Sequence, residues 1–318
     1  MQIVVTMEVT DEHKDILTNA AGNESIRFLP ERDVTATALA DADVIIGNVP
    51  PSLLQQVKNL KWLQLNSAGA NTYCEPGILR SEVLLTNATG AYGVAIAEHM
   101  VGVLLGMMKK LYTYYDNQKA KNWHDEGHVQ SIAGATVVIV GYGDIGRHFG
   151  RLMKAFGAAK VIGVRRRHGA VPPEVDEMVT LDELPSLLGS ADIVTASLPE
   201  TKATYHFFNT DFFNHMKKGS FFINVGRGTS VDQDALCRAL RDGTLAGASL
   251  DVTDPEPLPV ESPLWTTPGL YVTPHVSGGY HATVTHDTIV RIAATNLRHF
   301  LAGEALDNIV DRTTGYKK

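Results

Sequence analysis

The sequence predicts an α/β fold with two parallel sheets, and three observations support this prediction. Short apolar runs alternate with helical segments along most of the chain, which is the pattern of consecutive β–α–β units. One of these runs, residues 137–140, leads directly into glycines at the spacing Gly141-x-Gly143-x-x-Gly146, as at a turn from a strand into a helix. The length of 318 residues favours two domains, since a typical domain has about 150 residues.

The composition is that of a globular protein that binds neither nucleic acid nor membrane. Hydrophobic residues make up 44% and charged residues 20% of the chain, which is ordinary for a globular enzyme. The net charge of −7 argues against nucleic-acid binding, because affinity for a phosphate backbone comes largely from clustered Lys and Arg. The sequence shows neither a signal peptide nor the run of about 18 apolar residues that predicts a membrane span. Cys74 and Cys237 have no metal-ligand or disulfide-framework spacing, so we expect no metal and a reducing, cytoplasmic compartment.

The elements before about residue 90 predict a first parallel sheet. Strands are expected at 3–7, 44–46, 62–65 and 83–85, and helices at 11–21 and 51–57. The turn Ser67-Ala68-Gly69 follows one of these strands, where small residues expose backbone N–H groups to a ligand. An ordinary turn explains these residues equally well.

From Val94 onward, apolar residues recur at intervals of three and four and predict one helix of some 25 residues. A helix needs apolar cover, so we expect this one to join the two domains and to contribute to a homodimer interface. The alternative is a helix buried wholly within one chain.

The elements after residue 136 predict a second sheet, of the Rossmann type. Strands are expected at 137–140, 161–164, 193–196, 221–224, 246–251 and 270–272, with helices at 147–156 and 181–188. A last helix at about 287–301 follows the complete second sheet. We therefore expect it to pack back against the first domain, which makes that domain discontinuous.

The glycine turn predicts a dinucleotide site, because its helix N-terminus offers N–H groups and partial positive charge to a pyrophosphate. The expected cofactor contacts are Gly141, Tyr142, Gly143, Asp144, Ile145 and Gly146. An NAD site carries an acidic residue about 20 positions further on, but here Arg165 stands there, followed by Arg166 and Arg167. Arginine accommodates a 2′-phosphate, so NADP is preferred and NAD remains possible. The alternative is three solvated arginines on a surface loop.

Three further residues follow predicted strands, where α/β proteins place reactive groups. Arg227 lies after the strand at 221–224, Glu256 after the strand at 246–251 and His275 after the strand at 270–272. They would supply a cation, a carboxylate and a base to one cleft. Each residue taken alone also fits a role without function: Arg227 as a helix-terminal charge, Glu256 as a solvated loop acid and His275 as a turn residue.

These motifs resemble the D-isomer-specific 2-hydroxyacid dehydrogenases, which include D-lactate, D-glycerate, phosphoglycerate and glyoxylate/hydroxypyruvate enzymes. The resemblance covers most of the chain, from Ser67-Ala68-Gly69 and Ala97-Glu98 to Thr273-Pro274-His275. It implies a Rossmann-type doubly wound domain at 99–286 and a second, flavodoxin-like α/β substrate-binding domain at 1–98 and 287–318. The cleft between them is expected to hold the cofactor and a small 2-keto acid or D-2-hydroxy acid.

The resemblance also implies roles for residues. Arg227 holds the substrate carboxylate and carbonyl oxygen, His275 is the acid/base, and Glu256 orients His275. Physical chemistry agrees, because hydride arrival at a carbonyl carbon builds negative charge on oxygen, which needs a cation and a proton donor. The implied cofactor contacts elsewhere are Leu198, Pro199, Thr204, Val225, Asp251 and Gly278, and the implied substrate contacts are Ser67, Ala68, Gly69, Arg227 and His275. Asp251 alternatively caps the next turn.

The competing function is a non-enzymatic, nucleotide-sensing protein, because the family also contains transcriptional corepressors with the same fold. The substrate side chain stays open. Tyr73, Tyr92, Trp123 and Tyr280 are candidates to shape its pocket, which leaves glyoxylate, hydroxypyruvate and bulkier keto acids as alternatives.

Overall fold

The computed structural model describes residues 1–279, 282–313 and 316–317. The chain forms two compact units: unit 1 is Met1–Tyr92 with Tyr280–Lys318, and unit 2 is Gly93–Gly279. The sequence placed the corresponding boundaries at 98/99 and 286/287. Within the described residues, no helix combines the length and the apolar character needed to cross a membrane.

Unit 1 contains a parallel five-stranded sheet in the order β2-β1-β3-β4-β5. This is the strand order of flavodoxin-like folds, which is the class that the family resemblance implied. Its strands are β1 (Gln2–Val5), β2 (Ser25–Phe28), β3 (Val44–Ile46), β4 (Trp62–Gln64) and β5 (Leu84–Thr86). The edge strand β2 is one that the sequence pattern did not reveal. A short antiparallel pair, β13 (Val310–Asp311) and β14 (Tyr316–Lys317), lies outside this sheet.

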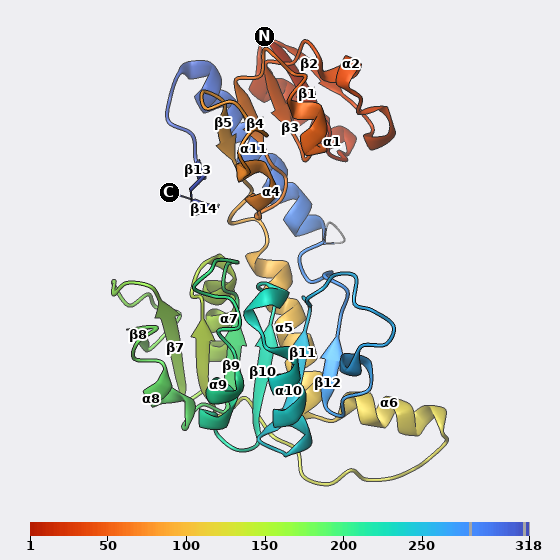
Figure 1. Ribbon diagram of the computed structural model, residues 1–318, viewed down its shortest axis with the longest axis vertical. Coiled ribbons are helices and arrows are strands. Elements are labelled where there is room, and N and C mark those ends of the chain that lie inside the picture. The colour runs from red at the N-terminus through yellow and green to blue at the C-terminus, as the bar shows by residue number, and fades with distance from the viewer. Residues whose placement is uncertain (280–281, 314–315, 318) are drawn as a thin grey trace. The chain divides into compact units, whose positions relative to one another are not determined.

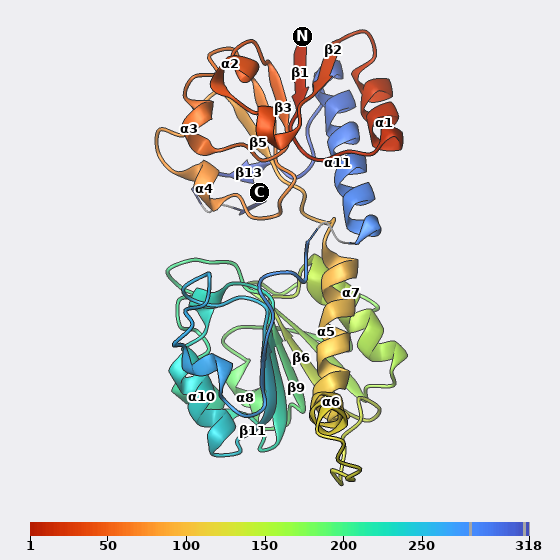
Figure 2. The ribbon, with the colours of Figure 1, turned by 90° about the vertical axis from the view of Figure 1, so that its right-hand side faces the viewer.

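Helices cover both faces of the unit 1 sheet, as Figure 2 shows. On one face lie α1 (Asp11–Ala21) and the C-terminal helix α11 (Thr283–Ala302), which pack on each other and on the sheet through residues such as Leu17, Ile289 and Leu297. On the other face lie the shorter helices α2 (Ala36–Leu39), α3 (Pro51–Leu54) and α4 (Asn71–Cys74), after a turn of 3₁₀ helix at Glu31–Asp33. Both ends of the chain therefore build unit 1.

Unit 2 contains a parallel seven-stranded sheet in the order β12-β11-β10-β9-β6-β7-β8 (Figure 1). Its strands are β6 (Thr136–Val140), β7 (Lys160–Arg165), β8 (Glu177–Thr180), β9 (Ile193–Ala196), β10 (Ser220–Asn224), β11 (Leu245–Leu250) and β12 (Leu270–Val272). The order reverses direction between β6 and β9. Such a switch point opens a crevice at the carboxyl ends of the strands, which is where doubly wound folds bind ligands.

The helices of unit 2 also lie on both faces of its sheet. In Figure 2, α5 (Gly93–Met108) and α7 (Asp144–Ala155) run along one face, and α8 (Pro185–Leu188) and α10 (Gln233–Arg241) along the other. Helix α9 (Thr210–His215) packs against α10, and short 3₁₀ helices occur at Gly228–Ser230 and Pro263–Trp265. Buried residues of the sheet and of α9 and α10 form one continuous core, including Val138, Ile162, Phe213 and Phe222.

The prediction of one helix of some 25 residues from Val94 is wrong. Helix α5 ends at Met108, and α6 (Leu111–Lys119) starts after Lys110, whose φ of 55° is left-handed (Figure 1). The Nζ of Lys109 donates to the carbonyl oxygen of Gln130 at 2.6 Å, and that of Lys110 to the carbonyl oxygen of Glu126. The apolar spacing continues across the break, and Lys is a good helix former, so nothing in the sequence marks it. Most of α5 is buried within unit 2.

Candidate active site

Three neighbouring strands of unit 2 deliver the three predicted catalytic residues to one edge of the sheet. Arg227 follows β10, Glu256 follows β11 and His275 follows β12, and these strands pair in parallel in that order. The loop after β10 also packs tightly on the loop after β11: a Cβ at Gly228 would lie 2.0 Å from the carbonyl oxygen of Thr253. Only glycine fits there, so backbone contact holds these two loops together.

Glu256 and His275 form a hydrogen-bonded pair. Nδ1 of His275 lies 2.8 Å from Oε2 of Glu256, while Oε1 of Glu256 accepts a hydrogen bond from the Thr253 backbone at 3.0 Å. Because a carboxylate only accepts, Nδ1 carries a proton. Nε2 has no partner among the described residues, and the His275 side chain is 52% exposed. This arrangement leaves Nε2 available to exchange a proton with a ligand.

Asp251 organises the loop that carries His275. Its Oδ1 accepts from Thr273 Oγ1 at 2.6 Å and from the Val276 backbone at 3.0 Å, and its Oδ2 accepts from the Ser277 backbone at 3.1 Å and from Ser277 Oγ. Its own carbonyl oxygen accepts from the His275 backbone at 2.8 Å. The residue is 2% exposed, and its carboxylate holds the loop after β12 together. The sequence suggested either a cofactor contact or a cap of the next turn, but the partners of Asp251 lie in the loop after β12 and not in the turn that follows β11.

His99 of α5 extends this network and was not identified from the sequence. Its Nε2 lies 3.4 Å from Oγ1 of Thr273. Since the single hydroxyl hydrogen of Thr273 points to Asp251, His99 is the donor in this contact. The histidine follows Ala97-Glu98, but only the fold brings it next to residue 273.

Arg227 is held by its backbone and keeps most of its guanidinium free. Its carbonyl oxygen accepts from Asn224 Nδ2 at 2.9 Å and from Ser230 Oγ at 2.7 Å, and its Nη1 donates to the carbonyl oxygen of Gly226 at 2.7 Å. Within the described part of the chain no acidic side chain pairs with it. A permanent cation without a carboxylate partner is suited to bind an anion.

The glycine turn connects β6 to α7 at the switch point of the sheet. Gly141 has φ 91°, and a Cβ there would lie 2.7 Å from the Ser197 carbonyl oxygen, so the turn requires glycine. Helix α7 has no side-chain N-cap. The N–H groups of Asp144, Ile145 and Gly146 are therefore the unpaired donors of its first turn, which suits a phosphate group.

Tyr142, within this turn, does not present its side chain to a ligand. It is 3% exposed, and its N–H donates to the Val164 carbonyl oxygen at 2.9 Å. Arg165, at the end of β7, donates from Nε to the Tyr142 carbonyl oxygen at 2.8 Å. Arg165, Arg166 and Arg167 are all exposed.

The other predicted cofactor residues also lie at the carboxyl edge of unit 2. Leu198 and Val225 follow β9 and β10 and are each 7% exposed. Thr204 is 8% exposed, and its Oγ1 donates to the Pro199 carbonyl oxygen at 2.6 Å, so its side chain closes its own loop. Gly278 follows the Ser277 that Asp251 binds.

In unit 1, Ser67, Ala68 and Gly69 follow β4 in a loop held by hydrogen bonds. Ser67 Oγ donates to the Gly69 carbonyl oxygen at 2.7 Å, and Asn87 Nδ2 donates to the Ala68 carbonyl oxygen at 2.7 Å.

The aromatic candidates for the substrate pocket have separate settings. The hydroxyl of Tyr73 donates a hydrogen bond to the carbonyl oxygen of Val49, and that of Tyr92 donates to the carbonyl oxygen of Asn66. Trp123 lies in the loop after α6, and Tyr280 lies outside the described residues.

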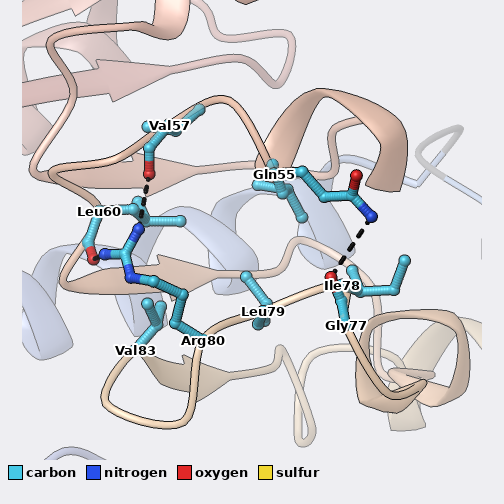
Figure 3. Close-up of a pocket in the computed structure, with 9 residues that line it drawn as sticks. Gln55, Val57, Leu60, Gly77, Ile78, Leu79, Arg80 and Val83 are labelled. Atoms are coloured by element: carbon cyan, nitrogen blue, oxygen red, sulfur yellow. Dashed lines mark hydrogen bonds between the residues drawn. The ribbon is translucent and has the colours of Figure 1, made fainter.

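A pocket of about 210 Å³ in unit 1 is drawn in Figure 3, and it is not the candidate site. Its residues Val57 and Leu60 precede β4, and Arg80 precedes β5, so it lies toward the amino ends of these strands. Arg80 donates to the carbonyl oxygens of Val57 at 3.2 Å and Leu60 at 2.8 Å and to Glu82 at 2.7 Å. Its guanidinium ties the chain before β4 to the chain before β5.

A family model and a curated relative match this chain. A family model described as "D-isomer specific 2-hydroxyacid dehydrogenase, NAD binding domain" matches residues 101–277. Glyoxylate/hydroxypyruvate reductase B of Escherichia fergusonii is 30% identical over 292 residues, 87% of this chain and 85% of the relative.

Solved structures agree with the sequence matches. A D-isomer specific 2-hydroxyacid dehydrogenase family protein from Aeromonas salmonicida superposes with a TM-score of 0.85 at 32% identity, covering 98% of this chain and 99% of the other. An NADPH-dependent glyoxylate/hydroxypyruvate reductase from Sinorhizobium meliloti, in complex with NADP and sulfate, gives 0.83 at 27% identity and covers 99% of both chains.

Proposed function

Because the chain belongs to the D-isomer-specific 2-hydroxyacid dehydrogenase family, we propose that it reduces a small 2-keto acid to the D-2-hydroxy acid with NADPH. The observation that carries the proposal is the His275–Glu256 pair, which leaves Nε2 of an exposed histidine available at the sheet edge where Arg227, with no acidic partner among the described residues, also lies. NADPH supplies the hydride. The protein must supply a proton and compensate the charge that develops on the carbonyl oxygen.

His275 is the proton donor in this mechanism. Glu256 holds the proton on Nδ1, so the proton that goes to the carbonyl oxygen leaves from Nε2 of the protonated ring. In the reverse reaction the neutral ring takes the hydroxyl proton back at the same atom. Asp251 keeps the backbone of this loop in place during both steps.

Arg227 binds the substrate carboxylate and carbonyl oxygen. Its planar guanidinium matches two oxygen atoms, and its charge opposes the negative charge on the substrate. The contribution of Ser67, Ala68 and Gly69 to substrate binding stays a prediction from the sequence.

The cofactor residues fit NADP better than NAD. The first turn of α7 offers its N–H groups to the pyrophosphate, as Gly141 to Gly146 predict. Arg165 stands where an NAD enzyme carries an acid, and its exposed guanidinium suits a 2′-phosphate. The reductase from Sinorhizobium meliloti, which has the same fold, was solved with NADP.

The test is NADPH oxidation by the purified protein with glyoxylate, hydroxypyruvate and bulkier branched and aromatic keto acids. We expect turnover with at least one small 2-keto acid, inhibited by its D-2-hydroxy acid product. Binding of NADPH without turnover on any member of the panel would favour the sensor function instead. Two of the relatives named above are called reductases, so the sensor is the less favoured function.

We also propose that the protein is a cytoplasmic homodimer, with α6 and the loop after it at the interface. Leu111 and Tyr115 of α6 are 54% and 59% exposed, and Trp123 is 104% exposed. Large apolar side chains gathered on one segment favour a protein–protein contact. Light scattering should give twice the mass of one chain, and Trp123→Lys with Tyr115→Lys should give a monomer. A monomeric wild type would contradict the proposal.

A further inference from the structure

We propose that Tyr142 is a positioning residue for Arg165, and that its buried ring sets how strongly the enzyme prefers NADPH over NADH. The inference rests on the proposed function, because it takes Arg165 as the group that contacts the 2′-phosphate. Tyr142 itself touches no cofactor atom through its side chain, since it is 3% exposed.

Tyr142 holds Arg165 at two points. The Nε of Arg165 donates to the Tyr142 carbonyl oxygen at 2.8 Å, and its Cζ lies 5.1 Å from the centroid of the Tyr142 ring. A guanidinium over an aromatic face is attracted to it. The hydrogen bond uses Nε alone, so both Nη groups stay available for a ligand.

The ring of Tyr142 is itself fixed by two glycines. A Cβ added to Gly163, in the middle of β7, would lie 2.9 Å from Cγ of Tyr142 and 2.5 Å from Sδ of Met178. A Cβ on Gly146 would lie 3.3 Å from Cδ2 of the same ring. The ring therefore fills a space that exists because both positions lack a side chain, and it packs directly against the two glycines.

The neighbouring arginines have no comparable support. Within the described residues, Arg166 and Arg167 form no hydrogen bond, ion pair or ring contact, and both are exposed. A free arginine loses rotamer freedom when it binds a ligand, whereas a pre-positioned one loses less. Arg165 is thus the arginine of the cluster that is prepared for a ligand.

The ring of Tyr142, and not its hydroxyl, is the part that positions Arg165, because the hydroxyl is buried without a hydrogen-bond partner among the described residues. Phenylalanine keeps the ring and removes that unpaired group. Leucine keeps the apolar character and removes the aromatic face. The two substitutions therefore separate the positioning role from the role of filling space.

The test is isothermal titration calorimetry of NADPH and NADH with the wild type, Tyr142→Leu and Tyr142→Phe at one ionic strength. We expect Tyr142→Leu to weaken NADPH binding by about two- to fivefold, the usual size of a cation–π contact at an exposed site, and to leave NADH binding unchanged. Tyr142→Phe should keep the wild-type ratio of the two Kd values. Equal weakening of both cofactors, or no change with leucine, would overturn the inference.

Two further variants test the same inference independently. In an Arg165→Ala background, Tyr142→Leu should cause no additional loss of NADPH affinity, because the positioned group is gone. Gly163→Ala would place a methyl group 2.9 Å from the Tyr142 ring and displace it, so it should weaken NADPH binding relative to NADH binding even if the leucine variant does not fold. A wild type that prefers NADH would instead refute the proposed cofactor and leave the contact between Tyr142 and Arg165 intact.

Discussion

The two halves of the unit 2 sheet prepare their carboxyl edges in different ways. At β10, β11 and β12, the chemistry lies in the side chains of Arg227, Glu256 and His275, and several loops cooperate to hold them. At β6 and β7, it lies mostly in backbone N–H groups that one local turn presents, with Arg165 as an exposed addition. We call these the side-chain half and the backbone half.

The difference teaches where each kind of substitution should act. Changes in the side-chain half alter the chemical step and should affect NADPH and NADH equally. Changes in the backbone half alter how the cofactor is chosen and should affect the ratio of the two. Four measurements break or sharpen this comparison, in order of decreasing effect.

The largest effect is expected for His275→Ala. Losing the positioned acid should lower kcat by about 10²–10⁴-fold with either cofactor. In the wild type, kcat/KM for reduction should fall as pH rises, because the imidazolium loses the proton it donates, and kcat/KM for oxidation should fall as pH drops. Steady-state kinetics with one keto acid would show this. Near-normal kcat at neutral pH would remove His275 from the mechanism.

Arg227→Lys comes next. Lysine keeps the charge but loses the planar fork, so KM for the keto acid should rise and kcat should fall together. The loss of a hydrogen bond to a charged group corresponds to about 10- to 100-fold in kcat/KM. The factor should be the same with NADPH and NADH. Unchanged kinetics would give Arg227 a structural role only.

Arg165→Asp should change cofactor choice rather than chemistry. The substitution removes a cation, sets a carboxylate against the 2′-phosphate and gives the ribose hydroxyls of NADH an acceptor. Screening at this exposed site limits the wild-type preference for NADPH to about tenfold or somewhat more. In the Arg165→Asp variant this preference should disappear or reverse. The readout is the ratio of kcat/KM values at fixed ionic strength. A wild type that prefers NADH would contradict the comparison.

The smallest effect concerns Tyr142. Burial, reinforced by the charge of Glu174, raises the pKa of its phenol from 10.0 to about 12, although Arg165 and Arg147 oppose the shift. A raised pKa means that the neutral phenol stabilises the fold fully below pH 10, and that this contribution is lost as pH rises toward about 12. The tyrosinate absorbance of wild type minus Tyr142→Phe should therefore show no step near pH 10. A step there would mean that the ring is solvated.

The sequence predicted those parts of the site that depend on local chain geometry. The glycine turn has a fixed spacing, and residues that follow strands of a parallel sheet meet at one edge, so Glu256 and His275 were expected to lie together. The role of Asp251 stayed open, because its partners Thr273 and Ser277 lie 22 and 26 residues further along the chain. No pattern in the sequence shows such contacts.

Prediction from the local preferences of residues failed at two edge strands and at one helix. Strands β2 and β8 lie at the edges of their sheets, and their polar residues, such as Arg27 and Glu177, hide the apolar pattern of a strand. The break at Lys110 was missed because the apolar spacing continues across it, while the contact of Lys110 there is with a carbonyl oxygen of the later loop at Glu126. In both cases tertiary context outweighs the preference of the residues themselves.

The same break has a consequence for how this protein can be altered. The backbone N–H of Gln130 donates to the carbonyl oxygen of Met108 at 3.2 Å, so the chain leaves the core and returns to it at almost the same place. Gln130 also anchors its end through Nε2 on the Gly219 carbonyl oxygen at 3.1 Å. Residues 109–129 therefore begin and end at one place on unit 2, and within them the Tyr112 ring packs with its centroid 4.0 Å from that of the Tyr271 ring. A segment of different length that keeps Tyr112 should leave β6, and the glycine turn behind it, where they are, while it removes the proposed dimer contact.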